Sequence, residues 1–446
     1  MRLTILGGGG FRVPLVYQAL LDDHAEGRVS HVTLHDLDPA RLAAIGRVLA
    51  AQADGVPDAP VVTTTTDLDE ALRGADFVFS AIRVHGLEGR TIDERVALAE
   101  GVLGQETVGA GGIAYGLRTV PVALDIASRI ARLAPHAWVI NFTNPAGLVT
   151  EAMSRELGDR VIGICDSPSG LGKRVARALG VVPSRAQLDY AGLNHLGWLR
   201  RVLVDGVDRL PELLADETAL ATFEEGKLFG TDWLRALGAI PNEYLHYYYF
   251  NREAVTAARA ATQTRGTFLL EQQRRFYADV ASCDTPALAA WHATRLERET
   301  TYMAENREAA GAGDRESGDL ESGGYEQIAL ALMRAIAQDQ RATLILNVRN
   351  RRTIEHLDAD AIVEVPCLVG SSGARPVAID ALPDHATALV ASVKAVERAV
   401  IEAAVTGSRG AALRALSVHP LVDSVAVARR LLDAYQEQLP QLSYLR

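Results

Sequence analysis

The amino-acid sequence predicts an α/β fold made of two domains. Residues 1–195 are expected to form a Rossmann-type, doubly wound parallel sheet, and residues 196–446 an α+β domain packed against it. Two observations carry this prediction: short apolar runs alternate with helical patterns through the first 200 residues, and a run of glycines follows the first apolar run. Beyond that point longer helical segments replace the alternation. A chain of 446 residues is long enough for each domain to bury its own core.

In the first half, strand and helix patterns follow one another in a regular order. Short apolar runs predict strands at Leu3–Leu6, His31–His35, Val61–Thr65, Phe77–Ile82, Trp138–Phe142 and Val161–Ile164. Helical patterns lie between them, at Pro14–Ala25, Pro39–Ala53, Val120–Leu133 and Pro168–Leu179. Repeated strand–helix–strand units specify a parallel sheet with helices on both of its faces.

The second half mixes longer helices with fewer strands. Helices are predicted at Ala254–Val280, Gly324–Ala337, Asp384–Ala404 and Val422–Gln436. Strands are predicted at Trp198–Val204, Thr343–Val348 and Ala361–Val365. Residues 305–324 are polar and rich in glycine, and we expect them to form a surface loop.

The net charge excludes some classes of partner. Lysine and arginine number 45 against 56 aspartates and glutamates, which gives a formal charge of −11. This charge disfavours general attraction to nucleic acid or to an anionic membrane, so a small-molecule partner is expected. An anionic substrate would need a local basic pocket, for which the candidates are Arg83, Arg90, Arg118 and Arg265.

Cysteine usage and hydropathy bear on the compartment. Cys165, Cys283 and Cys367 are odd in number and far apart, which is typical of a reducing environment. The first residues, MRLTILGGGG, enter a predicted strand at once, without the basic and apolar regions of a signal peptide. No run of 18 apolar residues occurs, so no membrane-spanning helix is predicted. We therefore expect a cytoplasmic protein.

A dinucleotide-binding motif follows the first predicted strand. Its glycines are Gly7, Gly8, Gly9 and Gly10. Glycines let the backbone approach a pyrophosphate, and the helix that follows offers backbone N–H groups at its positive end. Asp36 ends the second strand, where a carboxylate can accept hydrogen bonds from ribose hydroxyls. The motif thus predicts binding of NAD in preference to NADP, although Arg12 stands where a third glycine is usual.

A thiol and an imidazole are candidates for a metal site. Cys165 follows the sixth predicted strand, at the edge where such sheets bind ligands, and His195 lies 30 residues further along. A thiolate and an imidazole suit Mn²⁺, Fe²⁺, Co²⁺, Ni²⁺ or Zn²⁺. The residues alone leave another interpretation open, in which Cys165 is a small buried apolar group and His195 a hydrogen-bonded structural residue.

Two further segments carry polar groups suited to a site. The segment PNEYLHYYYF (241–250) places four tyrosines in six residues, which could equally form an aromatic wedge at a domain interface. Asn144 precedes a proline just after the fifth strand, in a turn that can present its side chain to a ligand.

Taken together, these segments resemble the family 4 glycoside hydrolases. These NAD- and metal-dependent enzymes include 6-phospho-β-glucosidases and 6-phospho-α-glucosidases. The matching stretches are ADFVFSAIRVHGLEGRTIDE (75–94), GQETVGAGGIAYGLRTVP (104–121), WVINFTNPAGLVTEA (138–152), GICDSP (163–168), GLNHLGW (192–198), PNEYLHYY (241–248) and VEVPCLV (363–369). They span most of the chain in the family's order.

The resemblance implies roles for individual residues. Cys165 and His195 would ligate a divalent metal, typically Mn²⁺. Asp166 is similar to the proton donor of the phospho-α-glucosidase relatives, and Tyr244 to the family's catalytic base. Arg90, Asn144 and Arg265 are similar to residues that contact the substrate. No such role is implied for Cys283 or Cys367.

The resemblance also implies a reaction, the hydrolysis of O-glycosidic bonds. NAD oxidises the sugar at C3, Tyr244 removes the C2 proton, and the aglycone is eliminated from C1 before water adds and the hydride returns. The metal acts as a Lewis acid on the C2 and C3 oxygens. This NAD-dependent family is an exception to the two-carboxylate scheme of most glycosidases. The expected substrate is a small 6-phosphorylated glycoside, and the expected assembly is a homodimer or homotetramer.

Several functions remain open from the sequence alone. The general resemblance favours a 6-phospho-β-glucosidase, whereas Asp166 and the segment 241–248 favour a 6-phospho-α-glucosidase. A 2-hydroxy-acid dehydrogenase of the lactate and malate type has a similar N-terminal fold but lacks the Cys–His pair. A protein that binds NAD without catalysis is the remaining alternative.

Two departures from the family pattern concern the sugar and phosphate pocket. The family usually has serine after its glycine triplet, where this chain has Gly10, followed by Phe11 and Arg12. Relatives often read N-N-G-x-I in the second half, where this chain has Asn350-Arg-Arg-Thr-Ile354. Both departures predict changes in the pocket more than in the chemistry.

Overall fold

A single mixed sheet runs through the protein, in the computed structural model that describes residues 1–282, 285–301 and 324–446. Its parallel half has the spatial order β3-β2-β1-β4-β5-β6, which confirms the predicted doubly wound Rossmann topology. The strands are β1 (Arg2–Leu6), β2 (His31–His35), β3 (Val61–Thr65), β4 (Phe77–Ser80), β5 (Trp138–Asn141) and β6 (Val161–Gly163).

Helices cover both faces of this parallel half. They are α1 (Val13–Leu21), α2 (Pro39–Ala53), α3 (Leu68–Leu72), α4 (Gly86–Ala99), α5 (Gly109–Leu133), α6 (Ala146–Leu157) and α7 (Ser167–Ala178). Successive side chains of a strand point to opposite faces, and here they enter two separate cores. Ile5 packs in the core that contains α1 and α2, while the next residue, Leu6, packs in the core that contains α5 and α6. Such strands, buried on both faces, explain the continuous apolar runs in the sequence.

The second half of the chain extends the same sheet with antiparallel strands. Strand β11 (Ala342–Arg349) pairs with β6 through Asn347 and Gly163, and the order continues β12-β7-β8-β10. These strands are β7 (Gln187–Leu193), β8 (Leu196–Val204), β10 (Ile240–Pro241) and β12 (Ile362–Gly370), with β9 (Val207–Asp208) and β13 (Gly373–Pro376) at their sides. The domain boundary predicted at residue 195 stays a prediction.

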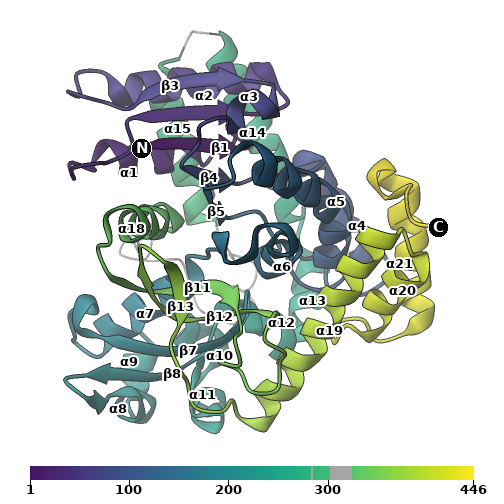
Figure 1. Ribbon diagram of the computed structural model, residues 1–446. Helices are drawn as coiled ribbons and strands as arrows, with labels where there is room; N and C mark the ends of the chain where they lie inside the picture. The colour runs from purple at the N-terminus through teal and green to yellow at the C-terminus, as the bar shows by residue number, and fades with distance from the viewer. Residues whose placement is uncertain (283–284, 302–323) are drawn as a thin grey trace.

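The helices of the second half pack back onto the first. They are α8 (Leu210–Ala215), α9 (Glu217–Leu220), α10 (Glu224–Phe229), α11 (Thr231–Leu237), α12 (His246–Tyr249), α13 (Asn251–Ala260), α14 (Arg265–Ser282), α15 (Ala287–Thr300), α18 (Tyr325–Gln338), α19 (Asp384–Thr406), α20 (Arg409–Val418) and α21 (Val425–Gln438). Helix α14 contacts α4, α15 contacts α2, α18 contacts α1, and α19 contacts α5 (Figure 1). The carboxyl ends of the parallel strands are thereby enclosed by elements from both halves.

Most predicted elements are present, with some differences in extent. The helix predicted at Ala254–Val280 is two helices, α13 and α14, because Ala261 takes an extended conformation and ends the first. Helix α5 begins at Gly109 rather than at residue 120, since its first turns are glycine-rich and do not show a helical pattern. Of the loop predicted at 305–324, all but Gly324 lies outside the described residues, and so does Cys283. Among the described helices, none is both long and apolar enough to cross a membrane.

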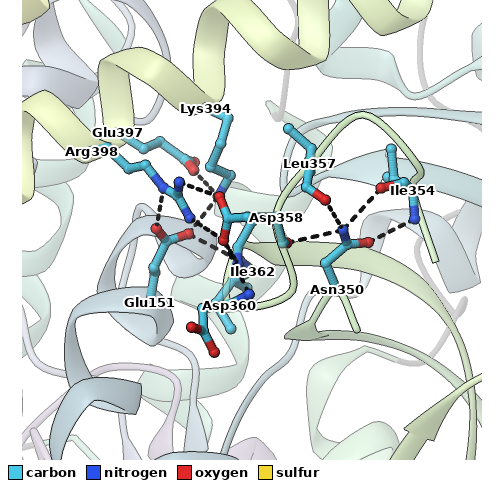
Figure 2. A network of polar contacts seen from close by, with 11 residues as sticks. Glu151, Asn350, Ile354, Leu357, Asp358, Asp360, Ile362, Lys394, Glu397 and Arg398 are labelled. Atoms are coloured by element: carbon cyan, nitrogen blue, oxygen red, sulfur yellow. Dashed lines mark hydrogen bonds and ion pairs between the residues drawn. The ribbon is translucent and has the colours of Figure 1, made fainter. Parts of the chain in front are cut away.

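A polar network joins α6, α19 and the connection between β11 and β12 (Figure 2). Glu151 accepts hydrogen bonds from Lys394 Nζ, Arg398 Nε and the backbone N–H of Ile362, each at 2.9 Å. Asn350 is buried and donates to the carbonyls of Ile354, Leu357 and Asp358, so it organises the connection itself. The segment 350–354, described throughout, does not line the large cavity described below, so its departure from the family pattern lies away from that cavity.

Candidate active site

A cavity of about 1640 Å³ lies at the carboxyl ends of the parallel strands. It has the position at which doubly wound folds bind ligands. Its lining includes most of the residues that the sequence singled out: Gly7, Gly10, Asp36, Arg83, Arg90, Asn144, Cys165, Asp166, His195, Tyr244 and Arg265. Residues separated by up to 258 positions in the chain are thus brought to one place by the sheet and by the helices that cover it.

The glycine turn is packed too tightly for side chains. Gly7 has a positive φ of 80°, and a Cβ there would lie 2.5 Å from the carbonyl oxygen of Ala81. A Cβ on Gly8 would lie 2.8 Å from the backbone nitrogen of His35, which explains why Gly8 faces β2 and not the cavity. The N–H of Gly9 donates to Asp36 Oδ2 at 3.0 Å, so the turn and the acid at the end of β2 are linked directly. This backbone cradle at the start of α1 has the position that binds a dinucleotide pyrophosphate in such folds, and Asp36 lies at its edge.

Cys165 and His195 reach the cavity from different strands. Cys165 follows β6, and His195 lies in the two-residue turn between β7 and β8, with a left-handed backbone (φ 61°). A non-glycine residue in this conformation costs of order 1 kcal/mol, and such strain is common at functional sites. Burial raises the pKa of the Cys165 thiol, and the nearby carboxylates Glu364 and Asp166 raise it further. The described residues hold no cluster of three or more His, Cys, Asp or Glu suited to a metal, so this pair is the candidate.

Hydrogen bonds fix which nitrogen of His195 is available. Gln105 Oε1 accepts hydrogen bonds from the backbone N–H groups of Thr107 and Val108 and from the Thr107 hydroxyl, at 2.6, 2.9 and 3.0 Å. The single proton of the Thr107 hydroxyl is used in its bond to Gln105. The hydroxyl oxygen therefore accepts a hydrogen bond from His195 Nδ1, at 3.1 Å. Nδ1 carries the proton, and Nε2 keeps its lone pair for a ligand. Burial lowers the pKa of His195 to about 4, which keeps the ring neutral at neutral pH, as a metal ligand must be.

Tyr244 lies directly beside this histidine. The two rings are stacked with centroids 3.8 Å apart and planes at 7°. Asn242 holds the segment in place, since its Oδ1 accepts from the Tyr244 N–H at 3.1 Å and its own N–H donates to the Gly197 carbonyl at 2.9 Å. The neighbouring Tyr249 accepts a hydrogen bond from Trp198 Nε1 and so acts in the aromatic wedge. Tyr249 thus fits the aromatic-wedge interpretation of the tyrosine-rich segment, while a catalytic role for Tyr244 stays a prediction.

A buried carboxylate that the sequence did not reveal, Glu364, connects the segments that carry His195 and Tyr244. Glu364 on β12 is almost fully buried and accepts hydrogen bonds from Asn347 Nδ2, Asn194 Nδ2 and the Tyr190 hydroxyl, at 2.8, 3.3 and 3.2 Å. Asn194 precedes His195, and the Tyr190 hydroxyl accepts from Asn242 Nδ2 at 3.4 Å. Burial raises the pKa of Glu364 to about 7. Glu364 thus connects the turn that carries His195 with the segment that carries Tyr244.

The cavity also has a basic side. Arg90 is buried and forms ion pairs with Glu94 at 2.7 Å and Glu106 at 2.8 Å, and Arg83 pairs with Glu106 at 2.7 Å. Arg265 donates to Thr301 Oγ1 and to the carbonyl oxygen of Arg298, at the end of α15.

Arg12, which stands where a third glycine is usual, and Arg298, which had no sequence signal, line the same cavity. Burial lowers the pKa of Arg298, and the positive charges of Arg12, Arg265 and Arg90 lower it further. Arg298 thus lies close to three other arginines of the cavity, with Glu106 as the opposing charge.

Three other predicted residues have distinct outcomes. Arg118 is outside the cavity lining and forms a buried bidentate ion pair with Asp93 at 2.6 and 2.7 Å, so its assignment to the basic pocket is wrong. Asn144 lines the cavity, and its Oδ1 is buried without a hydrogen-bond partner among the described residues, as expected of a group that awaits a ligand. Asp166 lies at the N-terminus of α7, without a side-chain hydrogen bond to that helix end.

Comparison with known proteins places the chain in one family. The "Family 4 glycosyl hydrolase" model matches residues 2–181, and the model of the family's C-terminal domain matches residues 190–422. A Bacillus subtilis protein named "Probable 6-phospho-beta-glucosidase" is 34% identical, over 99% of this chain and 98% of its own. A maltose-6'-phosphate glucosidase of the same organism is 30% identical, over 97% of this chain and 94% of its own. A Thermotoga maritima 6-phospho-β-glucosidase structure with manganese, NAD⁺ and glucose-6-phosphate superposes with a TM-score of 0.83 at 26% identity, over the full length of both chains.

Proposed function

Because the chain belongs to family 4 of the glycosyl hydrolases, we propose that it is a 6-phospho-β-glucosidase that works with NAD and a divalent metal, in the first instance Mn²⁺. The observation that carries this proposal is the meeting of four features in one cavity: the glycine turn, the Cys165 and His195 pair, the stacked Tyr244 and an arginine-rich wall. A glycosidase that relied on two carboxylates would need none of the first three.

The cofactor site is assigned to Gly7, Gly8, Gly9, Gly10 and Asp36. The glycine cradle leaves no space for side chains, and Asp36 is fixed at its edge by the Gly9 N–H. The carboxylate of Asp36 favours NAD over NADP, because it would repel the 2′-phosphate of NADP. The superposed Thermotoga maritima enzyme was crystallised with NAD⁺, which supports the assignment.

The metal site is assigned to Cys165 and His195. The neutral His195 with its free Nε2 and the buried Cys165 thiol form a donor set that fits Mn²⁺ and its neighbours in the first transition row. When bound, NAD supplies a hydride acceptor and the metal a Lewis acid at the sugar oxygens. Thr107 orients the imidazole, as hydrogen-bonded partners of metal-binding histidines generally do.

The proton transfers are assigned to two side chains. Tyr244 would take the proton from sugar C2, since its ring is held against His195 and both residues line the cavity. Asp166 would donate a proton to the leaving oxygen, from the N-terminus of α7 at the cavity wall. Arg90, Asn144 and Arg265 are assigned to substrate binding, and the buried unpaired Oδ1 of Asn144 supports its part in this.

A 6-phosphate on the sugar would account for the arginines. Arg12, Arg265 and Arg298 line the cavity of a chain whose net charge is −11, and guanidinium groups bind phosphate strongly through paired hydrogen bonds. The 6-phospho-α-glucosidase activity is the second candidate, because Asp166 is present and the maltose-6'-phosphate glucosidase relative is nearly as similar.

A screen of paired glycosides tests the proposal. Purified protein with NAD⁺ and Mn²⁺ would be offered nitrophenyl α- and β-glucosides, each with and without a 6-phosphate. We expect the 6-phospho-β-glucoside to be cleaved with the highest kcat/KM and the reaction to require both cofactors. Preference for the α-anomer would select the second candidate, and equal kcat/KM with and without phosphate would refute the phosphate assignment.

Location and assembly are part of the same proposal. A cytoplasmic location is supported by Cys165 and Cys367, which are free thiols. A homodimer or homotetramer is proposed as the assembly, to be measured by light scattering.

A further inference from the structure

Three aromatic side chains from the second half of the chain donate hydrogen bonds to the glycine turn. The Tyr277 hydroxyl (α14) donates to the Gly9 carbonyl at 2.6 Å. Trp291 Nε1 (α15) donates to the Phe11 carbonyl at 2.9 Å, and the Tyr325 hydroxyl (α18) donates to the Arg12 carbonyl at 2.9 Å. Side chains from three separate helices thus hold three backbone carbonyl groups within residues 9–12.

These bonds fix how the peptide groups of the turn are oriented. A peptide group is planar, so its N–H points away from its carbonyl oxygen. When the Phe11 carbonyl is held toward Trp291, the N–H of Arg12 in the same peptide group is held toward the other side, at the start of α1, where a dinucleotide pyrophosphate is bound in this fold. The N–H groups that follow the Gly9 and Arg12 carbonyls close the turn itself, since the Gly10 N–H donates to the Gly7 carbonyl at 2.9 Å and the Val13 N–H to the Gly10 carbonyl at 3.1 Å. The three aromatic donors therefore fix the shape of the turn, two of them, Trp291 and Tyr325, from the wall of the cavity.

The same three side chains are themselves firmly packed. The ring of Tyr325 is stacked on Phe142 with centroids 4.1 Å apart. Trp291 is 1% exposed and contacts Phe11. The ring of Tyr277 lies 4.3 Å below the guanidinium of Arg41. Because Trp291 and Tyr325 are buried, water does not readily replace a hydrogen bond that they lose, whereas Tyr277 is half-buried.

We propose that Tyr277, Trp291 and Tyr325 are positioning residues for NAD, through which the helices of the second half set the affinity for the cofactor. The inference rests on the proposed NAD-dependent function. In that function the cofactor must stay bound while a hydride leaves the sugar and returns to it. A turn held in its binding shape before NAD arrives loses less conformational freedom on binding, which slows cofactor release.

The test uses substitutions that delete one oxygen and keep the ring. Tyr277→Phe, Tyr325→Phe and the double variant would be titrated with NAD⁺ by calorimetry, as full-length protein. Tyr17→Phe is the matched control, because Tyr17 is as buried as Tyr325 and its hydroxyl donates to the Pro60 carbonyl at 2.9 Å, outside the cavity lining. Each variant loses one hydroxyl-to-carbonyl hydrogen bond per substitution, so the thermal stabilities of Tyr325→Phe and Tyr17→Phe should fall comparably.

We expect the NAD dissociation constant to rise about threefold in each single variant and about tenfold in the double variant, and less than twofold in the control. Manganese bound per chain should not change. Backbone amides of residues 9–13 should exchange hydrogen faster in the NAD-free variants than in the NAD-free parent, which gives a second readout. An NAD dissociation constant in the double variant within twofold of the parent would overturn the inference. Failure of the parent itself to bind NAD would overturn the proposed function, and the inference with it.

Discussion

The imidazole of His195 and the phenol ring of Tyr244 lie flat against each other, 3.8 Å apart between centroids and 7° from parallel. The His195 ring is also held by a hydrogen bond to Thr107 at Nδ1, and the backbone of Tyr244 is held by a hydrogen bond to Asn242 at its N–H. The stacking contact therefore helps to position both the proposed metal ligand and the proposed base. A substitution that moves either ring should also move the other.

Replacement of Tyr244 by Phe should remove the base and keep the stack. If general base catalysis supplies its usual factor, kcat should fall by about 10²–10⁴, with little change in the affinity for NAD or metal. Turnover in D₂O should leave deuterium at C2 of the product sugar, both in the parent and in whatever slow turnover the variant keeps, because every elimination breaks the C2–H bond. Tyr249→Phe, in the wedge beside Trp198, is the control. Loss of less than threefold activity in Tyr244→Phe would assign the base elsewhere.

Replacement of Cys165 by Ser should abolish tight metal binding. A neutral hydroxyl is a much poorer ligand than a thiolate for a borderline-soft cation, so metal content after dialysis should fall to a small fraction of the parent's. Elemental analysis measures it, and circular dichroism checks the fold. Cys367→Ser, at the other buried free cysteine, should keep its metal. Equal metal content in Cys165→Ser and the parent would contradict the assignment.

Replacement of Glu364 by Gln should weaken metal binding from a distance. The new amide group would face at least one of the three donors that now point at the carboxylate, which costs about 1–3 kcal/mol and loosens the turn that carries His195. Loss of such a supporting contact typically lowers metal affinity about 10- to 100-fold. Glu151→Gln is the matched control, since Glu151 also accepts three hydrogen bonds but lies in the network of Figure 2. Equal metal affinity in the two variants would mean that Glu364 is only structural.

The ion pairs of Glu106 should make stability depend on pH in the acid range. Burial alone would raise the pKa of Glu106, but Arg83 and Arg90 outweigh it and lower the pKa to about 2. In the unfolded chain the value is about 4.3. A depressed pKa stabilises the folded state above the unfolded value, by at most about 3 kcal/mol, and this is lost as pH falls toward 2.

Glu106→Gln should therefore melt below the parent at pH 7, and the difference should shrink between about pH 5 and pH 3. Differential scanning calorimetry at several pH values measures the melting difference and its change with pH. A melting difference that stays constant from pH 7 to pH 3 would show that Glu106 contributes through packing or neutral hydrogen bonds instead.

The parallel half of the fold could be predicted because its signals are local. Each strand is a short apolar run, and the glycines and Asp36 follow strand ends at fixed places. Helix α6 and strand β7 were missed, since the first begins within the Asn144–Pro145 turn and the second mixes polar with apolar residues. Which strands pair with one another over long stretches of sequence has no such local signal.

The candidate site shows the same limit. Cys165, His195 and Tyr244 could be found because they lie in short motifs that resemble a known family. Glu364 looked like one polar residue in an apolar strand, and Arg298 like a solvated residue on a helix. Only the pairing of β12 with β7 brings Glu364 behind Asn194, and only the packing of α15 on α2 brings Arg298 to the cavity.

The pairing of β6 with β11 has a consequence for how the chain folds. Gly163 on β6 pairs with Asn347, which follows 184 residues later in the chain, so this edge of the parallel half stays uncovered until that residue is in place. Until then β6 offers unpaired backbone groups, which invite pairing with another chain. A fragment that ends near residue 195 would keep that edge open and should aggregate. During synthesis, completion of the nucleotide-binding half should depend on the arrival of β11, so folding is slow and long-range even where each strand is locally well specified.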